Sequence, residues 1–512
     1  MGKISIMYFG GATMSDVLKI IKDSRLDDRQ KRHQLIKETE KSLPYVKISE
    51  KTKELLDKRI ICDLYEGNAP CYPHYLLPDY QKFFKNGSDY LNLKPPKDFY
   101  EAINALLIIY GYIPSITNYP VYLGQVDELL EPFTYGVSPE ELRKLLQMFL
   151  VNIDRNLPDG LVHLNIGPKA TKVGYLILEL ERELRNSVPN ISLKISTETP
   201  TEFLLEAVKT ALEVGKPYFV NHLEMTNILG ENYGIAGCYS SLKVGGGCHT
   251  LVRLNLKAIA ENSKGFGKFE ESLAEAVTAQ CELINARTKF IVEEANFFKN
   301  SFLVKEGLID LNKFTSMAGV YGLYECVELL TDGKMMGHDM EANTIALGII
   351  QKTMELVKIQ EGLYCAGTND QIGFHAQMGL ETDIDVTAGV RVKNGNEPGL
   401  VDQIMLGAKL QQYFDTGVND IYLFDRTAKG NFEGVVKIVN GAIKNGMRIM
   451  AINSVDAELV RVTGYLVKRT DLIRYFSGDQ FREVTVKLGA ETLKNNRIMD
   501  RKVIANFEKL VE

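Results

Sequence analysis

The sequence LVHLNI occupies residues 161–166, ISLKI occupies 191–195 and PYFV occupies 217–220. Each run is short, apolar and rich in β-branched or aromatic residues, which indicates a buried strand. The two segments between them, 173–184 and 200–214, carry apolar residues at helical spacing. Strands that alternate with helices of this length predict parallel βαβ units with right-handed crossovers.

The second of these helices also carries terminal signals. Thr199, Pro200 and Glu202 stand where an N-cap, a first-turn proline and a capping-box glutamate are expected, and Gly215 follows the last apolar residue. Further strands are predicted over 250–256, 420–424 and 447–452, and further elements over 98–111, 269–284, 323–330, 345–359, 400–413 and 432–444. We therefore expect one large α/β body.

The N-terminal region is different. Residues 16–59 are rich in lysine and glutamate with apolar residues at helical spacing, which is typical of exposed amphipathic helices, and residues 60–64 predict a short strand. Three prolines lie in the segment 67–80, which is therefore expected to be irregular, either packed on the body or serving as a lid over a substrate.

Composition excludes several classes of protein. The 512 residues are 45% hydrophobic and 25% charged, an ordinary globular balance that can bury a large core. A formal net charge of −6, without a basic stripe, argues against a nucleic-acid partner. The longest apolar run, 105–110, is too short to cross a membrane, and we expect a cytoplasmic protein. Seven cysteines without a Cys-x-x-Cys pair predict reduced thiols and no metal site.

A glycine near the C-terminus has a chemical use. Most of the 42 glycines mark turns, and Gly464 could be another. An unpaired electron on a glycine Cα, however, is delocalised by the flanking amides, and no side chain twists it out of plane. The stretch RVTGYL at 461–466 resembles the Arg-Val-x-Gly-Tyr signature of the glycyl radical enzymes and matches all four fixed positions.

A stored backbone radical needs a relay to reach a substrate, and a cysteine thiol exchanges hydrogen atoms readily. Cys281 and Cys326 fall on apolar helix faces, and Cys62 and Cys365 lie in or beside short apolar strands, where cysteine usually acts as a small hydrophobe. The remaining candidates are Cys71, Cys238 and Cys248.

Cys238 is the preferred relay. It follows Gly237 and precedes polar residues, which predicts a tight loop tip, and the chain then returns as a strand to complete a finger. Cys248 lies on the same finger beside His249, which could lower its thiol pKa. A relay needs a hydrogen atom rather than a thiolate, so this pairing gives no advantage.

Together these motifs resemble the YjjI-type glycine radical enzymes over nearly the whole chain. The resemblance implies a ten-stranded α/β barrel of two half-sheets with central finger loops, as in anaerobic ribonucleotide reductases. It divides the chain into an N-terminal helical and lid segment (1–90), a barrel body with the thiyl finger (91–430) and a C-terminal glycyl radical domain (431–512). It further implies a homodimer of anaerobic metabolism without a bound cofactor, whose Gly464 radical is installed by a partner S-adenosylmethionine radical enzyme.

The substrate is not indicated. The second cysteine of pyruvate formate-lyases is missing, since Gly237 and Tyr239 flank Cys238, and Ser240 stands where diol- and amine-eliminating relatives have a glutamate base. Anaerobic ribonucleotide reductases share the strand after the finger, but their cysteine-rich zinc site is not found.

Five polar residues cluster around the finger in sequence and could bind a small organic substrate or move protons: Asn221, His222, Glu224, Ser240 and His249. Three alternatives stay open. The protein could reduce a substrate as ribonucleotide reductases do, it could be a spare part for an oxygen-cleaved relative, or it could be a non-radical α/β enzyme in which Gly464 is only a turn.

Overall fold

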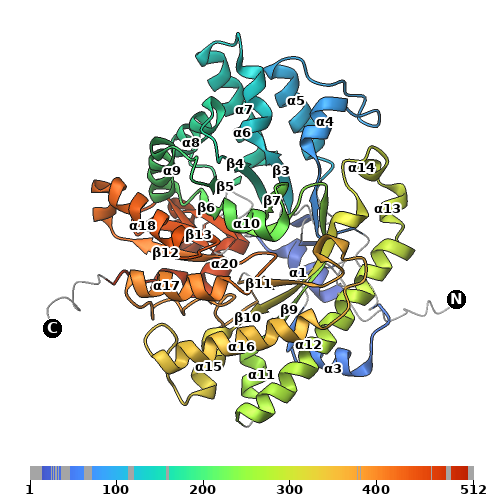
Figure 1. The fold of residues 1–512 in the computed structure, drawn as a ribbon, viewed down its shortest axis with the longest axis vertical. Helices are drawn as coiled ribbons and strands as arrows, with labels where there is room; N and C mark the ends of the chain where they lie inside the picture. Colours follow the sequence, from blue (N-terminus) through green and yellow to red (C-terminus); the bar gives the residue numbers. More distant parts are fainter. Residues whose placement is uncertain are drawn as a thin grey trace.

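The computed structural model describes residues 14–24, isolated positions from 26 to 38, and residues 46–62, 72–113, 120–156, 161–263, 265–377, 379–380, 382–462, 464–479 and 486–504. Two sheets form its centre, and helices surround their outer faces (Figure 1). They are separate hydrogen-bonded ladders within the described residues.

The first sheet has six strands in the order β12-β13-β6-β5-β4-β3. The strands are β3 (Val121–Gln125), β4 (Val162–Ile166), β5 (Asn190–Ile195), β6 (Tyr218–Asn221), β12 (Asp420–Phe424) and β13 (Ile449–Ser454). All neighbours are parallel except β13 and β6. The surrounding helices are α7 (Pro139–Asn156), α8 (Lys172–Leu184), α9 (Thr201–Val214), α10 (His222–Leu229), α17 (Leu400–Gln411) and α18 (Phe432–Lys444). The βαβ units expected from the sequence are confirmed.

The second sheet has five strands, β1-β9-β10-β11 with β2 also paired to β9. They are β1 (Ile61–Cys62), β2 (Tyr75–Leu77), β9 (Gly246–Asn255), β10 (Phe314–Tyr321) and β11 (Gly373–Ala376). Its helices are α3 (Glu50–Asp57), α11 (Leu256–Glu261), α12 (Phe266–Lys289), α15 (Leu323–Leu330) and α16 (Met340–Lys358). The apolar face of α12 packs on β9 and β10, as its sequence pattern predicts.

Shorter elements complete the described chain. The remaining helices are α1 (Met14–Lys22), α4 (Tyr80–Asn86), α5 (Phe99–Tyr110), α6 (Val126–Leu130), α13 (Phe297–Asn300), α14 (Phe302–Lys305), α19 (Arg469–Ser477) and α20 (Val486–Asn495). The single turns are η1 (Glu131–Thr134), η2 (Phe290–Glu294), η3 (Leu311–Lys313), η4 (Ala366–Thr368), η5 (Arg426–Gly430) and η6 (Ile498–Asp500). None of the helices in the described residues is long and apolar enough to span a membrane.

Two antiparallel hairpins stand apart from the sheets. The first hairpin, which is the finger, pairs β7 (Tyr233–Ala236) with β8 (Ser240–Lys243), and Cys238 lies in its turn. The second pairs β14 (Leu459–Val462) with β15 (Tyr465–Lys468), and Gly464 lies in its turn. Both candidate radical residues therefore occupy hairpin tips, where a backbone or a small side chain can be presented to another element.

The strand β2 corrects one expectation, because it lies in the proline-rich segment predicted to be irregular. Pro73 and Pro78 flank the strand instead of interrupting it, so neither removes a ladder hydrogen bond. Tyr75 pairs with Cys248 at the start of β9. A Cβ on the adjacent Gly247 would lie 2.0 Å from the Tyr75 carbonyl oxygen, so the glycine run at 245–247 allows the two backbones to approach.

Two further expectations are wrong in detail. Helix α9 has Pro200 at its N-cap, and Thr199 instead accepts a hydrogen bond from the Ser196 amide at 3.0 Å, which closes the preceding turn. Gly215 ends the helix as predicted, with a φ of +69°. Cys365 precedes the 3₁₀ turn η4 and is at the end of no strand in the described part of the chain, although its buried thiol contacts Ser316 of β10.

Candidate functional site

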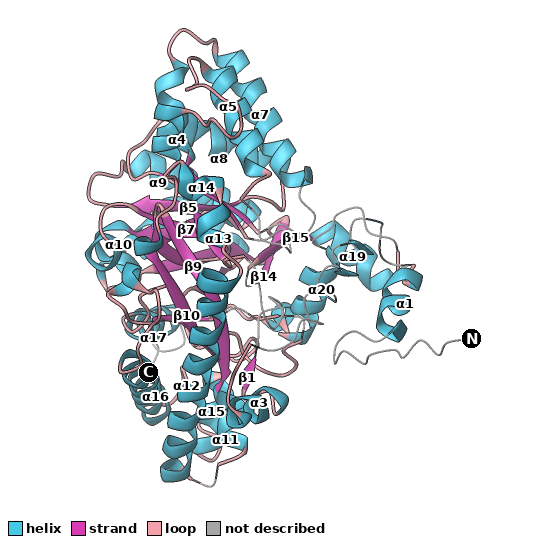
Figure 2. Ribbon diagram, turned by 90° about the vertical axis from the view of Figure 1, so that its right-hand side faces the viewer, coloured by secondary structure: helices cyan, strands magenta, loops and turns pink. Residues whose placement is uncertain are grey.

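The tips of the two hairpins are bonded to the same side chain of the first sheet, Asn190. In Figure 2 the hairpin β14–β15 lies between the sheets and the helices α19 and α20, which pack on β15. The side-chain amide of Asn190 donates to the carbonyl oxygen of Gly464 at 3.0 Å and to that of Gly237 at 3.3 Å. Those two oxygens can therefore be no further apart than the sum of the two bonds, and Cys238 is the next residue after Gly237.

Asn190 is held in one orientation. It is the first residue of β5, and its Oδ1 accepts a hydrogen bond from Arg461 at 3.3 Å. Since a guanidinium only donates, the amide oxygen must face Arg461 and the NH₂ group must face the two carbonyls. The amide thus fixes the backbone on both sides of the gap between the hairpin tips.

Arg461 anchors the second hairpin to the amino ends of the strands. Its Nε donates to the Gly215 carbonyl at 2.6 Å, and its guanidinium lies 4.1 Å from the ring centre of Tyr218 and donates to that hydroxyl. Its own carbonyl accepts from Arg501 at 2.9 Å. The side chain is fully buried, so these contacts fix the loop that carries Gly464.

His163 bonds to the same Gly237 carbonyl of the finger that Asn190 does. Its Nδ1 lies 2.8 Å from the Gly237 carbonyl and its Nε2 lies 2.8 Å from Ser192 Oγ. Burial lowers the pKa of His163 to about 3, so the ring is neutral and carries one N–H. A carbonyl can only accept, which places that proton on Nδ1 and leaves Nε2 to accept from the Ser192 hydroxyl.

Cys238 keeps its hydrogen. Its side chain is 3% exposed, and burial raises the pKa of the thiol to about 11, although the Tyr239 amide, Arg391 and Arg461 act in the opposite direction. The group is therefore a protonated thiol near neutral pH, which is the form that a hydrogen-atom relay requires.

The finger is also bonded to the second sheet. The ring of Tyr239 stacks on His375 of β11 at 5.6 Å between centroids, and its hydroxyl donates to the Ala376 carbonyl at 2.8 Å. The Ser241 amide donates to the Thr416 carbonyl at 2.8 Å. The tip is thus clamped between both sheets.

The other candidate cysteines lie elsewhere. Cys248 is buried in β9 between β2 and β10, and its thiol donates to the Thr250 carbonyl at 3.1 Å. Cys71 lies outside the described residues. Cys281 and Cys326 are buried on helices α12 and α15, as their sequence pattern predicts.

Three of the five predicted substrate residues make their contacts outside the finger. Asn221 caps α10 by accepting from the Glu224 amide at 3.3 Å, and both residues line a depression between α9, α10 and α18. His249 packs between Phe298 and Phe314, and burial lowers its pKa to about 4.

The other two lie on or beside the finger. Ser240 is next to Tyr239 and fully buried, and its hydroxyl has no hydrogen-bond partner among the described residues. His222 lies near the base of the finger, where its Nδ1 is 3.0 Å from the Tyr233 hydroxyl.

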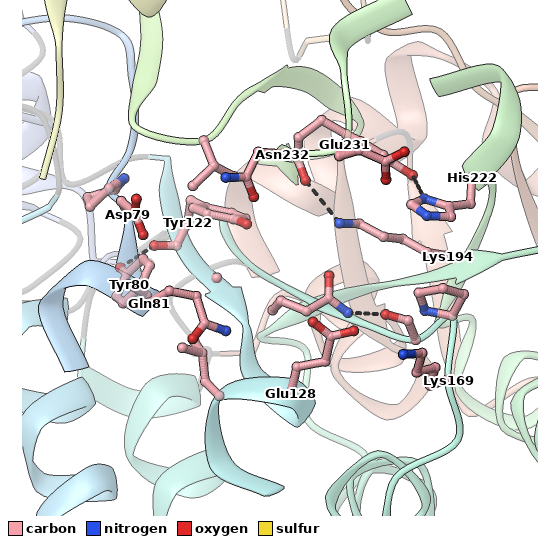
Figure 3. A pocket seen from close by; sticks show the side chains of 18 of the residues that line it. Asp79, Tyr80, Gln81, Tyr122, Glu128, Lys169, Lys194, His222, Glu231 and Asn232 are labelled. Atoms are coloured by element: carbon pink, nitrogen blue, oxygen red, sulfur yellow. Dashed lines mark hydrogen bonds between the residues drawn. The ribbon is translucent and has the colours of Figure 1, made fainter. Parts of the chain in front are cut away.

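His222 also lines a cavity of about 300 Å³ at the carboxyl ends of β3, β4 and β5 (Figure 3). Lys194 reaches into it, donating to the Tyr233 carbonyl at 2.9 Å, and burial lowers the pKa of this amine to about 8. Cys238 is five positions after Tyr233, an extended length of at most roughly 16 Å, with three of these steps inside β7. The cavity therefore lies at the opposite end of the finger from the thiol.

Sequence reasoning missed Asn190, His163 and Tyr218. They stand at or near the amino ends of the adjacent strands β5, β4 and β6. A polar residue in an otherwise apolar strand is the signal that could have found them, because buried polar groups need partners. Their partners could not be named without the strand order.

The chain matches one family model, "Glycyl radical enzyme YjjI-like", over residues 26–504. It is 39% identical over 501 residues to the uncharacterized protein YjjI of Escherichia coli (strain K12), covering 96% of both chains. It is 36% identical over 505 residues to an uncharacterized protein of Haemophilus influenzae, covering 96% of this chain and 98% of that one.

Solved structures with the same fold are more distant in sequence. The glycerol-bound B12-independent glycerol dehydratase from Clostridium butyricum gives a TM-score of 0.68 at 14% identity over 92% of this chain and 84% of that one. Hydroxyproline dehydratase from Clostridioides difficile, with trans-4-hydroxy-L-proline bound, gives a TM-score of 0.67 at 13% identity, covering 96% of this chain and 89% of that one. An anaerobic ribonucleotide reductase gives a TM-score of 0.67 at 12% identity, covering 90% of this chain and 88% of that one. These matches confirm the expected fold, and the chain belongs to the YjjI-like family of glycyl radical enzymes.

Proposed function

We propose that Gly464 stores the radical, that Cys238 relays it, and that the resulting thiyl takes a hydrogen atom from a small organic substrate. The observation that carries this assignment is the amide of Asn190, which joins the backbone at Gly464 to the backbone beside Cys238. Two hairpins that are remote in sequence thus share one hydrogen-bond donor, which supports the exchange of a hydrogen atom between their tips.

Each step moves one hydrogen atom. An activating enzyme removes a hydrogen atom from the Gly464 Cα, and this radical then takes the hydrogen of the Cys238 S–H bond. The thiyl takes hydrogen from a substrate C–H bond, which re-forms S–H and leaves a substrate radical. After the substrate radical has reacted, the product radical takes the hydrogen back, so the radical is conserved.

The protein holds the reacting atoms in place and keeps water away from them. A reactive C–H bond must be held about 3–3.5 Å from sulfur for such a transfer. Burial of Cys238 and the bonds of the finger to both sheets would hold the sulfur still and exclude water from the radicals.

The radical chemistry requires an activating enzyme as a partner. The activating enzyme is proposed to be a separate S-adenosylmethionine radical enzyme, and no other cofactor is assigned to this chain. We also propose a homodimer that works in the cytoplasm under anaerobic conditions. Light scattering after size-exclusion chromatography measures the oligomeric state, and the mass of one chain would reject the dimer.

Electron paramagnetic resonance of the anaerobically activated protein tests the assignment. The unpaired electron couples to the one hydrogen left on the glycine Cα, so we expect a two-line spectrum from the wild type. Gly464→Ala should give no such signal, and Cys238→Ala should keep the signal but lose turnover. A full-strength doublet in Gly464→Ala would reject the storage site.

Two alternatives are separated by different experiments. A spare part for a cleaved relative needs only the radical hairpin, so Cys238→Ala would remain active in a rescue assay. Reduction of a substrate in the manner of ribonucleotide reductases uses the same relay, and product analysis separates it from elimination.

A further inference from the structure

Arg391 lies beside the finger tip with part of its guanidinium unused. Its Nε donates to the Asn419 carbonyl at 2.9 Å, and its guanidinium carbon lies 5.9 Å from the ring centre of Tyr239, the residue after Cys238. The side chain is 7% exposed. Its Nη2 is buried, and no described residue accepts a hydrogen bond from it.

Other buried polar side-chain atoms also have no hydrogen-bond partner among the described residues. Asn419 is 2% exposed, and in the described part of the chain neither its Nδ2 nor its Oδ1 is hydrogen-bonded. The same holds for Nη2 of Arg461 and for the hydroxyl of Ser240. Buried polar atoms are satisfied in the great majority of cases, because leaving one without a partner is costly. Arg391 and Arg461 interact electrostatically with the Cys238 thiol, and the Asn419 carbonyl is bonded to Arg391. Either water or a polar ligand could complete the hydrogen bonds of these atoms.

The charged side chains near Arg391 indicate that a ligand there would carry a negative charge. Arg391 and Arg461 are buried and Arg501 is half-buried, and each interacts electrostatically with the other two. The carboxylates of Asp420 and Glu397 oppose them, and burial raises the pKa of both. Even with both carboxylates ionised, three cations face two anions. Buried charge is stable only when it is paired, so the site lacks at least one negative charge.

A carboxylate fits this deficit. It brings one negative charge, and its two oxygens match the planar donors of a guanidinium. A phosphate would bring up to two charges and exceed the imbalance. The amide of Asn419 offers one donor group and one acceptor, which suits a hydroxyl or carbonyl group next to a carboxylate.

We propose that the substrate of Cys238 carries a carboxylate, which binds Arg391, and that Asn419 contacts a polar group beside it. This inference rests on the proposed function and names its substrate class. The carboxylate is held at the finger tip, so the C–H bond attacked by sulfur lies within a few bonds of it.

Ligand binding to the unactivated protein tests the proposal without any radical. Thermal unfolding and calorimetry are measured with three pairs that differ in having a carboxylate or a CH₂OH group: lactate and 1,2-propanediol, glycerate and glycerol, and 3-hydroxybutyrate and 1,3-butanediol. Inorganic phosphate forms a separate arm, and chloride keeps the ionic strength constant. We expect the carboxylates to raise the unfolding midpoint and their alcohol counterparts to have no comparable effect.

Variants assign the effect to Arg391. Truncating one partner of a buried charge pair should weaken carboxylate binding at least about 30-fold in Arg391→Gln. Arg391→Lys, which keeps the charge, should retain part of the affinity and guards against misfolding of the first variant. Arg426→Gln removes an arginine whose side chain is 80% exposed and should bind as the wild type does.

Several results would overturn the proposal. Equal effects of acid and alcohol would show that water satisfies these atoms, stronger binding of phosphate would show another anion class, and unchanged affinity in Arg391→Gln would place the carboxylate elsewhere. No binding by any carboxylate would reject it as well. Loss of the glycyl radical signal would instead reject the radical assignment, so the two failures are distinguishable.

Discussion

Asn190 shows how much of this site depends on one side chain. Its amide joins backbone atoms of residues that are 47 and 274 positions away in the sequence. Arg461 orients the amide and His163 shares one of its acceptors. The sequence motif around Gly464 indicates a radical, but nothing local to Asn190 indicates that it would contact that motif.

Asn190→Ala tests this contact at the residue scale. Loss of the amide removes both backbone bonds and one acceptor of Arg461, which should lower the unfolding free energy by about 1–3 kcal/mol. If Asn190 positions the relay, deuterium should also pass more slowly from solvent to the Gly464 radical, as followed by paramagnetic resonance. Asn440→Ala on α18 is the matched control. A stability loss with an unchanged exchange rate would make Asn190 structural only.

His163 predicts a pH effect. The pKa of an unfolded histidine is about 6.5, and the folded value is about 3 because the ring is buried. Between these values the unfolded chain binds the extra proton, so this contribution to stability is present above pH 6.5 and is lost as the pH falls. In His163→Asn the slope of unfolding free energy against pH should decrease by up to about 1.4 kcal/mol per pH unit in this window. Urea unfolding from pH 4.5 to 6.5 measures it, and equal slopes would contradict a buried neutral ring.

At the scale of elements, the finger depends on its turn. Gly237 has a φ of +58°, and a Cβ there would lie 2.8 Å from the Tyr75 hydroxyl oxygen. Both the left-handed backbone and the approach to β2 therefore favour glycine. This turn sets where the thiol of the next residue stands.

Gly237→Ala should lower the unfolding free energy by about 1–3 kcal/mol through this strain. Gly441→Ala is the control, since it lies inside α18 with no atom within 4 Å of the added Cβ. Helix propensity predicts that the control is stabilised by roughly 0.5–1 kcal/mol. Denaturant midpoints compare the two, and equal stability in both variants would mean that the turn tolerates a side chain.

The sequence predicts some elements much better than others. The strands β4, β5 and β6 are apolar runs with glycine, proline or asparagine at their ends, so their pattern is sufficient. The strand β10 was missed because FTSMAGVY mixes small and polar residues, although all eight are buried between β9 and β11. The strand β11 has only four residues. Both are defined by parallel pairing with distant strands, which no local window contains.

At the scale of the whole molecule, two sheets and two hairpins contribute to the site: the first sheet is bonded to both hairpin tips, and the second sheet is bonded to the finger. The class of fold could be predicted from βαβ alternation, and the loop that we propose to carry the radical could be proposed from its motif. The relay cysteine could be proposed from its glycine-bounded tip. The arginine and asparagine near it could not, because Arg391 and Asn419 lie in separate loops and the sequence does not show that they contact each other. The expected boundary at residue 431 stays a prediction, although β13, which follows it, lies inside the six-stranded sheet.

The most direct measurement is the paramagnetic resonance spectrum of the activated protein in H₂O and in D₂O. A thiol exchanges its hydrogen with solvent, so a relay that trades hydrogen between Cys238 and Gly464 must carry deuterium onto the glycine Cα. The two-line signal of the wild type should collapse to a single line in D₂O, and that of Cys238→Ala should keep its splitting. A wild-type doublet that persists in D₂O, or a collapse that survives Cys238→Ala, would contradict the relay.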